Sequence, residues 1–187
     1  IEGNSATGNT VQGNWIGVAA NGVSALGNTQ NGIRIFAPDT AFAVYNTIGG
    51  TFSGAGNLIA FNGYNGVAVG GSATGNAILS NSIHGNSRLG IDLGEDGVTV
   101  NDIGDYDTGP NNLQNFPMLA TLISNRSTIT GTLKSNAITT YRVEFFVNNT
   151  CDSTYGEGQQ FLGAVNATTD MQGDATFTLA TTAHRDG

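Results

Sequence analysis

A short internal repeat in the first half of the chain limits the possible folds more than any other feature. Three segments lead from a glycine into an apolar–x–apolar run: Asn31–Ile35, Asn65–Val69 and Leu89–Leu93. A second set reads N-x-[VI]-x-x-N, at Asn9–Asn14, Asn57–Asn62 and Asn76–Asn81. The repeats recur at intervals of about 20 residues, which is the length of one coil of a solenoid. The sequence therefore predicts stacked β-coils with Asn and Gly at the corners.

Stacking the coils places equivalent apolar residues in interior columns. The predicted columns are Ile33–Val67–Ile91, Ile35–Val69–Leu93 and Val11–Ile59–Ile78, and the intervening row Arg34–Ala68–Asp92 is expected to face outward. The longer step from Gly32 to Gly66 includes Thr47–Thr51 and Ser53–Gly56, which we interpret as a loop insertion. Corner asparagines suit a left-handed backbone and can hydrogen-bond from coil to coil. A Gly-rich β-sandwich with accidental similarity is the alternative.

The second half has a different pattern. Five strand-like runs are separated by Asn, Ser, Gly and Asp turns: Met118–Ser124, Thr128–Leu133, Thr140–Val147, Gln160–Thr168 and Ala175–Thr181. Tyr141, Val143 and Phe145 alternate onto one face. We predict an antiparallel, immunoglobulin-like sandwich that lacks one or two of the usual seven strands, which later sequence or a neighbouring strand would supply. The predicted domains are residues 1–100 (coils), 101–116 (acidic linker or cap) and 117–187 (sandwich).

Several strings resemble a known architecture. The segments ATGNTVQGNWIG, NTIGG with AGNLIAFN, and NGVAV with ATGNAILSNSIHGN resemble the right-handed parallel β-helix repeats of large secreted and surface proteins of bacteria. GIDLGEDGVTVNDIGDYDTGPNNLQNFPML resembles the segment that closes such helices, and YRVEFFVNNTCDSTYGEGQQFLGA resembles the start of the β-sandwich module that follows. The resemblance implies an all-β fold and an extracellular or cell-surface location, and it says little about activity.

Acidic residues are concentrated between the two halves. The net charge is −8, and residues 92–116 hold six acids and no base. Asp105 and Asp107 alternate before Gly109, and Asp102 and Asn111 lie nearby, so these four residues are the candidate ligands of a calcium ion. The segment lacks the distal Glu of an EF-hand, and a solvated acidic loop is the alternative. The chain has one Lys and no basic stripe, so we do not expect nucleic acid to be a partner.

Catalysis is not expected, although parallel β-helices also carry polysaccharide lyases and hydrolases. Hydrolysis needs two carboxylates facing one groove. Asp92 with Glu95 or Asp96, near Arg88, is the nearest approach to that pattern, and no row of carboxylates is visible. His84 and His184 are isolated. Aromatic residues near the corners suit either sugar stacking or packing against the coils: Trp15, Tyr45 and Tyr64.

The sequence contains candidate residues for two kinds of covalent modification. Asn125, Asn148 and Asn166 begin N-x-[ST] sequons, and glycosylation is expected to favour Asn148 and Asn166 because each borders a turn. Cys151 is the single cysteine, so it is either a buried thiol or a bridge to another chain.

The sequence favours an extracellular structural or adhesive module, without membrane insertion, over a carbohydrate-active enzyme or carbohydrate-binding protein. A few coils bury too little to be stable with open ends. We therefore expect the repeat to continue in flanking sequence of a larger surface protein, or subunits to stack head to tail into a fibre. Glycans are the remaining candidate partners.

Overall fold

The computed structural model describes residues 1–3, 5–38, 41–120, 128–150 and 156–181. These residues form fourteen β-strands and one short 3-10 helix, η1 (Pro110–Leu113), and they contain no α-helix. The all-β class predicted from the sequence is therefore confirmed. No helix among the described residues is long and apolar enough to cross a membrane.

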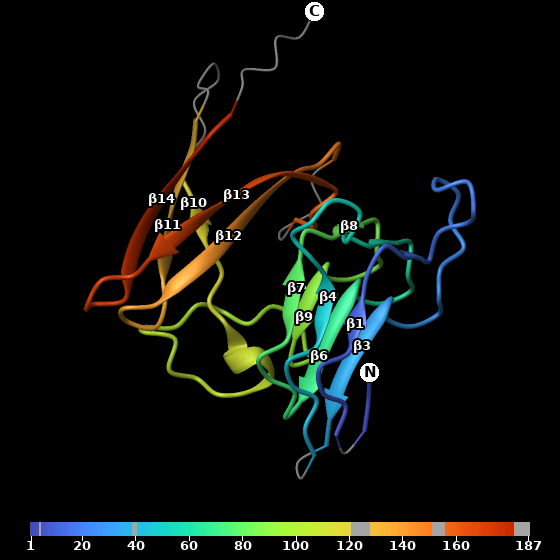
Figure 1. Cartoon of the computed structure of the whole chain (residues 1–187), viewed down its shortest axis with the longest axis horizontal. Helices are drawn as coiled ribbons and strands as arrows, with labels where there is room; N and C mark the ends of the chain where they lie inside the picture. Colours follow the sequence, from blue (N-terminus) through green and yellow to red (C-terminus); the bar gives the residue numbers. More distant parts are fainter. Residues whose placement is uncertain (4, 39–40, 121–127, 151–155, 182–187) are drawn as a thin grey trace, which may run out of the picture. The chain divides into compact units, whose positions relative to one another are not determined.

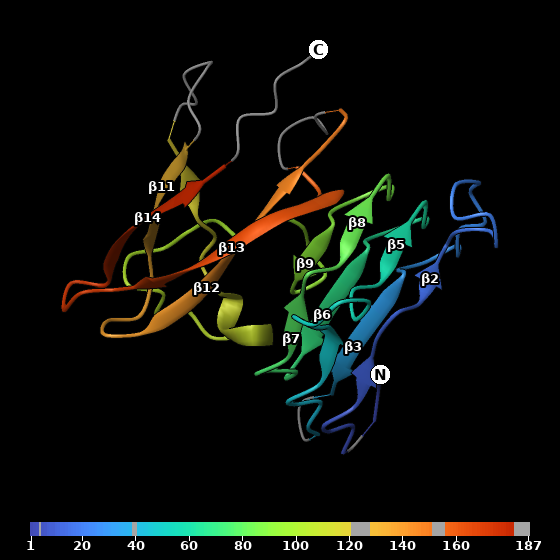
Figure 2. The same cartoon turned by 45° about the horizontal axis from the view of Figure 1, so that its top comes forward.

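Nine short strands in the first half of the chain follow one another through three sheets in a fixed order. Coil 1 contains β1 (Thr10–Val11), β2 (Trp15–Ile16) and β3 (Ile33–Ala37), coil 2 contains β4 (Thr47–Gly49), β5 (Leu58–Ala60) and β6 (Val67–Gly71), and coil 3 contains β7 (Ala77–Leu79), β8 (Ser82–His84) and β9 (Ile91–Leu93). The sheets are β1-β4-β7, β2-β5-β8 and β3-β6-β9, all parallel (Figures 1 and 2). Each coil therefore adds one strand to every sheet.

The register confirms two predicted columns and corrects the third. Ile33 aligns with Val67 and Ile91, and Ile35 aligns with Val69 and Leu93, as predicted. Ile91 is 44% exposed, however, so it is not the interior residue that was expected. The column Val11–Ile59–Ile78 is wrong: Val11 aligns with Ile48 and Ile78, whereas Ile59 aligns with Ile16 and Ile83. The pattern N-x-[VI]-x-x-N occurs on two consecutive sides of a coil, so Asn57 and Asn76 lie one side short of a full turn.

The predicted loop insertion at Thr47–Thr51 is also wrong in part. Thr47–Gly49 is strand β4, the central strand of the β1-β4-β7 sheet. Its Gly-Gly sequence suggested a loop, but Gly49 has a φ of +83° at the strand end, where the chain turns the corner. Only the residues on either side of β4 lengthen this coil.

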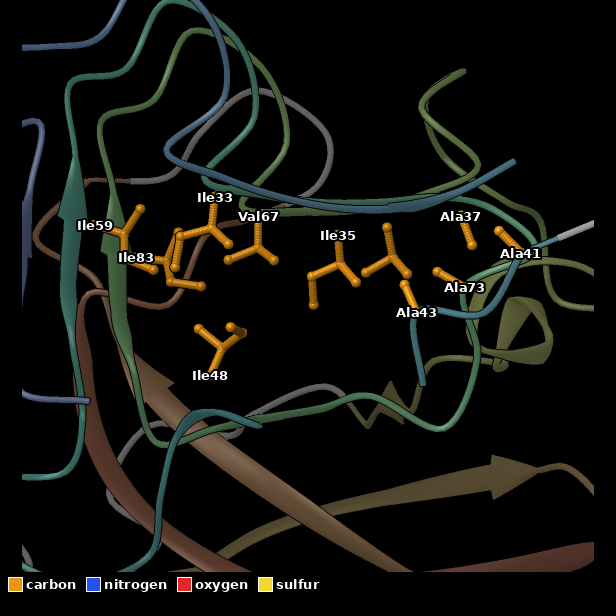
Figure 3. Close-up of a cluster of buried hydrophobic side chains, with 11 residues drawn as sticks. Ile33, Ile35, Ala37, Ala41, Ala43, Ile48, Ile59, Val67, Ala73 and Ile83 are labelled. Atoms are coloured by element: carbon orange, nitrogen blue, oxygen red, sulfur yellow. The ribbon is translucent and has the colours of Figure 1, made fainter. Parts of the chain in front are cut away.

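Aliphatic side chains fill the space between the three sheets. Ile35, Ile48, Ile59, Val67 and Val69 are fully buried in one cluster (Figure 3). Coil 2 supplies most of these residues because it has a neighbour on both sides. Val11 and Ile16 of coil 1 are only partly buried.

Asparagines form hydrogen-bonded ladders at the corners, as the sequence predicted. Their backbone N–H groups donate to the side-chain oxygen of the equivalent asparagine: Asn9 to Asn46 (2.9 Å) and Asn46 to Asn76 (3.0 Å), Asn14 to Asn57 (2.9 Å) and Asn57 to Asn81 (3.0 Å), and Asn28 to Asn62 (3.2 Å). The left-handed conformation lies elsewhere than expected, because positive φ belongs to the residue before the asparagine, as at Tyr45, Phe61 and Ser80. The ladders leave the buried amides satisfied.

The row Arg34–Ala68–Asp92 has the predicted register but is not an exposed outer face. Ala68 is fully buried and Asp92 is 2% exposed. The turn after β9 folds back over the row, and Glu95 Oε1 pairs with Arg34 Nε at 2.5 Å. The small Ala68 side chain lies between these two charged partners in the row.

Five further strands build a second core. β10 (Met118–Leu119), β11 (Thr128–Lys134) and β14 (Asp174–Ala180) form one antiparallel sheet, and β12 (Thr140–Val147) and β13 (Gln160–Thr168) form another. Both sheets contribute to one cluster: Leu133, Val143, Phe145, Ala167, Ala175 and Phe177. Four of the predicted strands agree closely with these bounds, and Val143 and Phe145 share the buried face as expected. The predicted strand Met118–Ser124 is represented by β10 alone, and residues 121–124 lie outside the described part of the chain.

The chain divides into two compact units whose boundaries interleave along the sequence. The three-sheet unit comprises residues 1–99, 108–113 and 146–161. The two-sheet unit comprises residues 100–107, 114–145 and 162–187. The described residues where β12 ends and β13 begins, 146–150 and 156–161, thus group with the coils.

Candidate functional site

Three aspartates come together in the loop of the two-sheet unit that follows the coils. One carboxylate oxygen from each of Asp102, Asp105 and Asp107 lies within 4.8 Å of the others. Asp105 has a left-handed backbone (φ +57°), and Gly104 before it has a φ of +81°, so the chain reverses sharply and turns the three side chains toward one place. Hard oxygen ligands that converge in this way suit calcium.

Asp105 is the fixed member of the cluster. It is 4% exposed, and its Oδ1 accepts from Asn115 N at 3.0 Å. Its Oδ2 accepts from Gln114 Nε2 at 2.9 Å and from the Ser135 hydroxyl. These donors fix the position and orientation of the carboxylate within the loop.

Asp102 and Asp107 each have an oxygen without a protein partner. Asp102 Oδ1 and Asp107 Oδ1 are buried and form no hydrogen bond with the described residues. Burial raises the pKa of Asp107, and the charges of Asp102 and Asp105 raise it further. Buried polar atoms are normally paired. Two unpaired carboxylate oxygens in one acidic cluster are therefore what a bound cation would satisfy.

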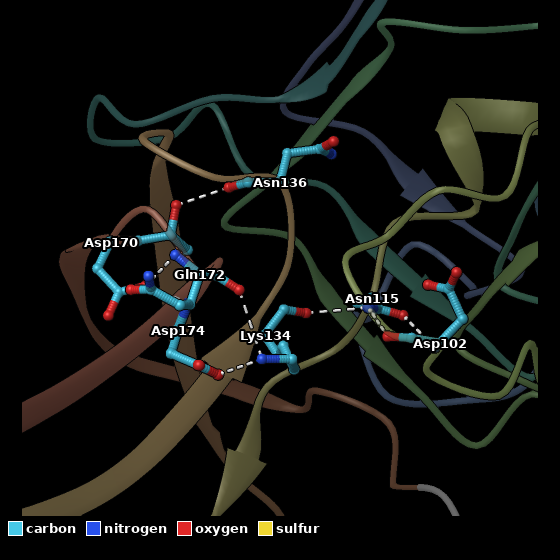
Figure 4. Close-up of polar contacts among 8 residues, drawn as sticks. Asp102, Asn115, Lys134, Asn136, Asp170, Gln172 and Asp174 are labelled. Carbon is cyan, nitrogen blue, oxygen red and sulfur yellow. Dashed lines mark hydrogen bonds and ion pairs between the residues drawn. The ribbon is translucent and has the colours of Figure 1, made fainter.

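Hydrogen bonds hold the loop in place around the cluster. Asn115 Nδ2 donates to the carbonyls of Asp102 and Lys134, each at 2.9 Å (Figure 4). Asn115 Oδ1 accepts from Asp102 N at 3.0 Å, and Tyr106 N donates to Asp102 Oδ2 at 3.1 Å. Asn115 is 4% exposed. Sequence analysis missed its role because one asparagine in an Asn-rich segment carries no distinguishing signal.

The fourth predicted ligand, Asn111, has a different role. It belongs to the three-sheet unit, where its Oδ1 accepts from Asn76 N at 2.9 Å and its Nδ2 donates to Asn76 O at 2.8 Å. Asn111 therefore continues the ladder Asn9–Asn46–Asn76 by one step. Its own φ of +47° allows it to do so from η1.

Glu157 continues a second ladder in the same unit. Its carboxylate accepts from Asn86 N at 3.2 Å and from Asn86 Nδ2 at 2.9 Å. Beside it, Ile83 N donates to Gly158 O at 2.7 Å, and Ser82 Oγ donates to Gln159 O at 2.5 Å. The segment of residues 157–159 therefore supplies acceptors to coil 3. No local sequence pattern indicated this contact because it joins residues more than 70 positions apart.

The predicted sequons lie in different settings. The side chain of Asn148 is engaged on both atoms, since its amide nitrogen donates to Glu157 O and its oxygen accepts from Gln159 N at 2.7 Å. Asn166 is exposed and lies within β13 rather than beside a turn. Asn125, Cys151 and His184 lie outside the described residues.

The residues of the enzyme alternative take part in structural contacts. Asp92 Oδ2 accepts from Asn65 Nδ2 at 2.9 Å, and burial raises the pKa of Asp92. Glu95 pairs with Arg34 through both oxygens, at 2.5 and 2.6 Å. His84 packs edge-on against Phe61, with 5.7 Å between ring centroids.

Of the three corner aromatics, Trp15 and Tyr45 lie over glycines of the coils, Gly22 and Gly75 respectively. Both remain largely exposed, at 56% and 73%. Tyr64 differs because the guanidinium of Arg88 covers its ring at 4.2 Å.

Comparison of the chain with protein-family models and with curated proteins gave no match. Functional conclusions therefore rest on the chain's own residues and their geometry.

Proposed function

We propose that the protein is an extracellular structural module in which a short right-handed parallel β-helix is followed by an immunoglobulin-like sandwich. Three parallel sheets visited in one order, with asparagine ladders at the corners, support the β-helix. Two antiparallel sheets around one core support the sandwich. The resemblance to repeats of bacterial surface proteins supports the extracellular setting.

The observation that carries this proposal is the difference between the two sides of the coil stack. On coil 3, Asn111 and Glu157 complete the ladders of Asn76 and Asn86. On coil 1, Asn9 and Asn14 are exposed, whereas interior residues of both outer coils, such as Val11 and Ile78, are partly buried. Described residues therefore continue these two asparagine ladders beyond coil 3, and the ladder ends on coil 1 are exposed.

Coil 1 is accordingly the assembly surface, and its partner is a further coil of the same pattern. Ile1 and Glu2 already show how such a segment packs, because Ile1 O accepts from Phe36 N at 3.0 Å and Glu2 forms a parallel bridge with Phe36. A strand edge with half-covered apolar residues recruits another strand. Because the ladder ends of Asn76 and Asn86 on coil 3 are already paired, association of the chain with itself is expected to bring the coil 1 surfaces of two copies together.

Sedimentation velocity over a range of protein concentrations tests the assembly surface. We expect the wild-type chain to associate as concentration rises and Val11→Lys to stay monomeric, because a charge at the coil 1 surface opposes stacking. Val23→Lys is the matched control, since Val23 is 75% exposed in a loop. A wild-type chain that stays monomeric at every concentration, or equal effects of the two substitutions, would contradict the proposal.

We also propose that the Asp102–Asp105–Asp107 cluster binds calcium and stabilises the loop between the two halves of the chain. The buried, unpaired oxygens of Asp102 and Asp107 favour this candidate over a solvated acidic loop. Because the pKa of Asp107 is raised, protons should compete with calcium and the affinity should fall as the pH is lowered.

Calorimetric titration and melting with calcium or with chelator test this site. Calcium should raise the melting temperature of the wild type. Asp107→Asn should abolish that rise and should itself raise the melting temperature in chelator, because it removes a repelled buried charge. Asp96→Asn, an exposed acid outside the cluster, is the control and should respond like the wild type. An equal calcium response in Asp107→Asn would contradict the assignment.

A further inference from the structure

Both basic side chains of the three-sheet unit line one open depression. Arg34 and Arg88 are the only Lys or Arg residues in the segments that form this unit. The depression has a volume of about 500 Å³, and Gln30, Asn31, Tyr64 and Glu95 also line it. Although the chain has a net charge of −8, the two basic side chains of this unit, Arg34 and Arg88, lie at the same depression.

Three of the lining residues form a column along one corner of the coils. Tyr64 N donates to Gln30 O, and Arg88 N donates to Tyr64 O, each at 3.2 Å. The three side chains are therefore in register, one from each coil. Since neighbouring strands lie about 4.8 Å apart, the column extends roughly 10 Å. That length matches a short segment of an extended polymer better than one small molecule.

The two arginines differ in how they are neutralised. Arg34 forms a two-point ion pair with Glu95, at 2.5 and 2.6 Å. Arg88 is exposed and lies over the Tyr64 ring, and no carboxylate of the described residues is within ion-pair distance of it. Stacking on Tyr64 fixes the plane of a guanidinium whose hydrogen-bonding edges remain available. Arg88 is thus an oriented cation at one end of the column.

The column combines an aromatic ring, an oriented guanidinium and side-chain amides. Arginine recognises carboxylate and sulfate-like oxyanions through two parallel hydrogen bonds. Gln30 and Asn31 carry amides that can donate to and accept from hydroxyl groups. Nucleic acid is a poor match because it requires several cations for its phosphates. A polymer with ring hydroxyls and widely spaced oxyanions matches all three chemistries.

We propose that this corner column binds an acidic polysaccharide, with Arg88 holding a carboxylate or sulfate group, Tyr64 orienting Arg88, and Gln30 and Asn31 contacting the sugar hydroxyls. This binding role goes beyond the structural role proposed above and does not depend on it. It also separates Tyr64 from Trp15 and Tyr45, whose rings lie against Gly22 and Gly75 and are not among the residues that line this depression.

Binding of the intact chain to immobilised polysaccharides tests the proposal. The probes are polygalacturonate, which carries carboxylates, dextran sulfate, which carries sulfates, and unmodified dextran as the neutral control. We expect binding to at least one acidic polymer and none to dextran. Whichever acidic polymer binds more tightly identifies the oxyanion that Arg88 accepts.

Three variants locate the bound surface. Arg88→Ala should weaken binding about tenfold, the loss expected from one charge-assisted two-point contact, and Tyr64→Ala should weaken it by a smaller factor. Arg142→Ala removes the same charge from the two-sheet unit, where Arg142 pairs with Glu144, and should leave the affinity unchanged. Trp15, the single tryptophan, reports by its fluorescence whether the coils of each variant remain folded.

Several results would overturn the proposal. These are the absence of binding to both acidic polymers, equal binding to dextran, and equal losses in Arg88→Ala and Arg142→Ala. An Arg88→Ala protein that keeps its Trp15 spectrum and its full affinity would also overturn it.

Discussion

At the residue scale, the ladder asparagines are polar residues that stabilise the folded coils through buried hydrogen bonds. Asn57 is 1% exposed, and its side chain accepts from Asn14 N and donates to Val11 O and Asn81 Oδ1, at 2.8 to 2.9 Å. Alanine at this position removes these three hydrogen bonds, each of which contributes about 1 kcal/mol. We expect Asn57→Ala to lower the free energy of unfolding by about 3 kcal/mol.

Urea denaturation followed by Trp15 fluorescence measures this loss in the coils. Asn149→Ala is the control, because Asn149 is exposed and changes of such residues stay within about 0.5 kcal/mol. Equal stability of the two variants would show that the ladder hydrogen bonds add nothing beyond those made with water.

Asp92 interrupts the fourth ladder with a charge. Asn65 N donates to Asn31 Oδ1 at 3.0 Å, and Asn65 Nδ2 donates to Asp92 Oδ2. Burial raises the pKa of Asp92 above 3.8, while its hydrogen bonds to Gly97 and Asn65 act in the opposite direction. The protonated form is therefore favoured in the folded state. The stabilisation that protonated Asp92 gives to the folded state is fully present below about pH 3.8, the unfolded pKa. It is lost as the pH rises through the raised pKa of the folded state.

Asp92→Asn should remove the loss of stability that accompanies ionisation of Asp92 at higher pH. We expect the free energy of unfolding of Asp92→Asn to exceed that of the wild type at pH 7, and the difference to shrink toward pH 4. Denaturation monitored by Trp15 fluorescence at several pH values measures this difference in the free energy of unfolding. The Arg34–Glu95 ion pair is present in both proteins, so its own pH dependence should cancel in the comparison. A difference that grows as the pH is lowered would contradict the sign of the shift.

At the element scale, glycines at the strand ends determine how closely successive coils approach. Gly49 at the end of β4 has a φ of +83°, and a Cβ there would lie 2.0 Å from Leu79 O of β7. Gly54 has nearly the same φ, +81°, with nothing within 4 Å. We expect Gly54→Ala to cost about 1–2 kcal/mol from left-handed strain alone. Gly49→Ala should cost roughly 2 kcal/mol more, because the coils must also separate.

The comparison of these two melting curves isolates the steric part of the cost, since the backbone strain is shared. Equal losses in both variants would indicate that coil spacing adapts freely to an added methyl group.

The sequence predicted where the strands of the repeat lie, but it did not predict which side of a coil each asparagine pattern belongs to. Alternation around Gly32, Gly66 and Gly90 located β3, β6 and β9 and their register, because one buried face fixes the side-chain period. The asparagine pattern repeats on two sides of each coil, and sequence alone does not distinguish a side from a full turn. Val11 was consequently aligned with Ile59 instead of Ile48.

The candidate calcium site was predictable only as far as its local sequence reaches. Asp102, Asp105 and Asp107 lie within six residues, and the alternation of Asp105 and Asp107 was visible. Asn111 was added by proximity alone, but it pairs with Asn76 in the coils. Ser135 and Asn115, which hold the Asp105 loop, are placed by tertiary structure and have no local signature. Glu157 was not predicted for the same reason, because its contact with Asn86 joins residues 71 positions apart and has no local sequence signature.

At the scale of the whole molecule, two separate cores should give two unfolding transitions. One cluster is centred on Ile35, Ile48 and Ile59, and the other on Phe145 and Phe177, whose rings meet edge to face at 5.6 Å. Separate cores unfold independently unless the contacts that join them are strong. Calorimetry should therefore show two peaks, only one of which coincides with the Trp15 fluorescence transition.

Calcium distinguishes these two transitions further. Asp102, Asp105 and Asp107 belong to the two-sheet unit, and a ligand that binds only the folded form stabilises the unit that holds its site. Calcium should therefore raise the transition that Trp15 does not report and leave the Trp15 transition unchanged. A single peak that moves as one with calcium would instead show that β12 and β13, which contribute residues to both units, make the molecule unfold cooperatively.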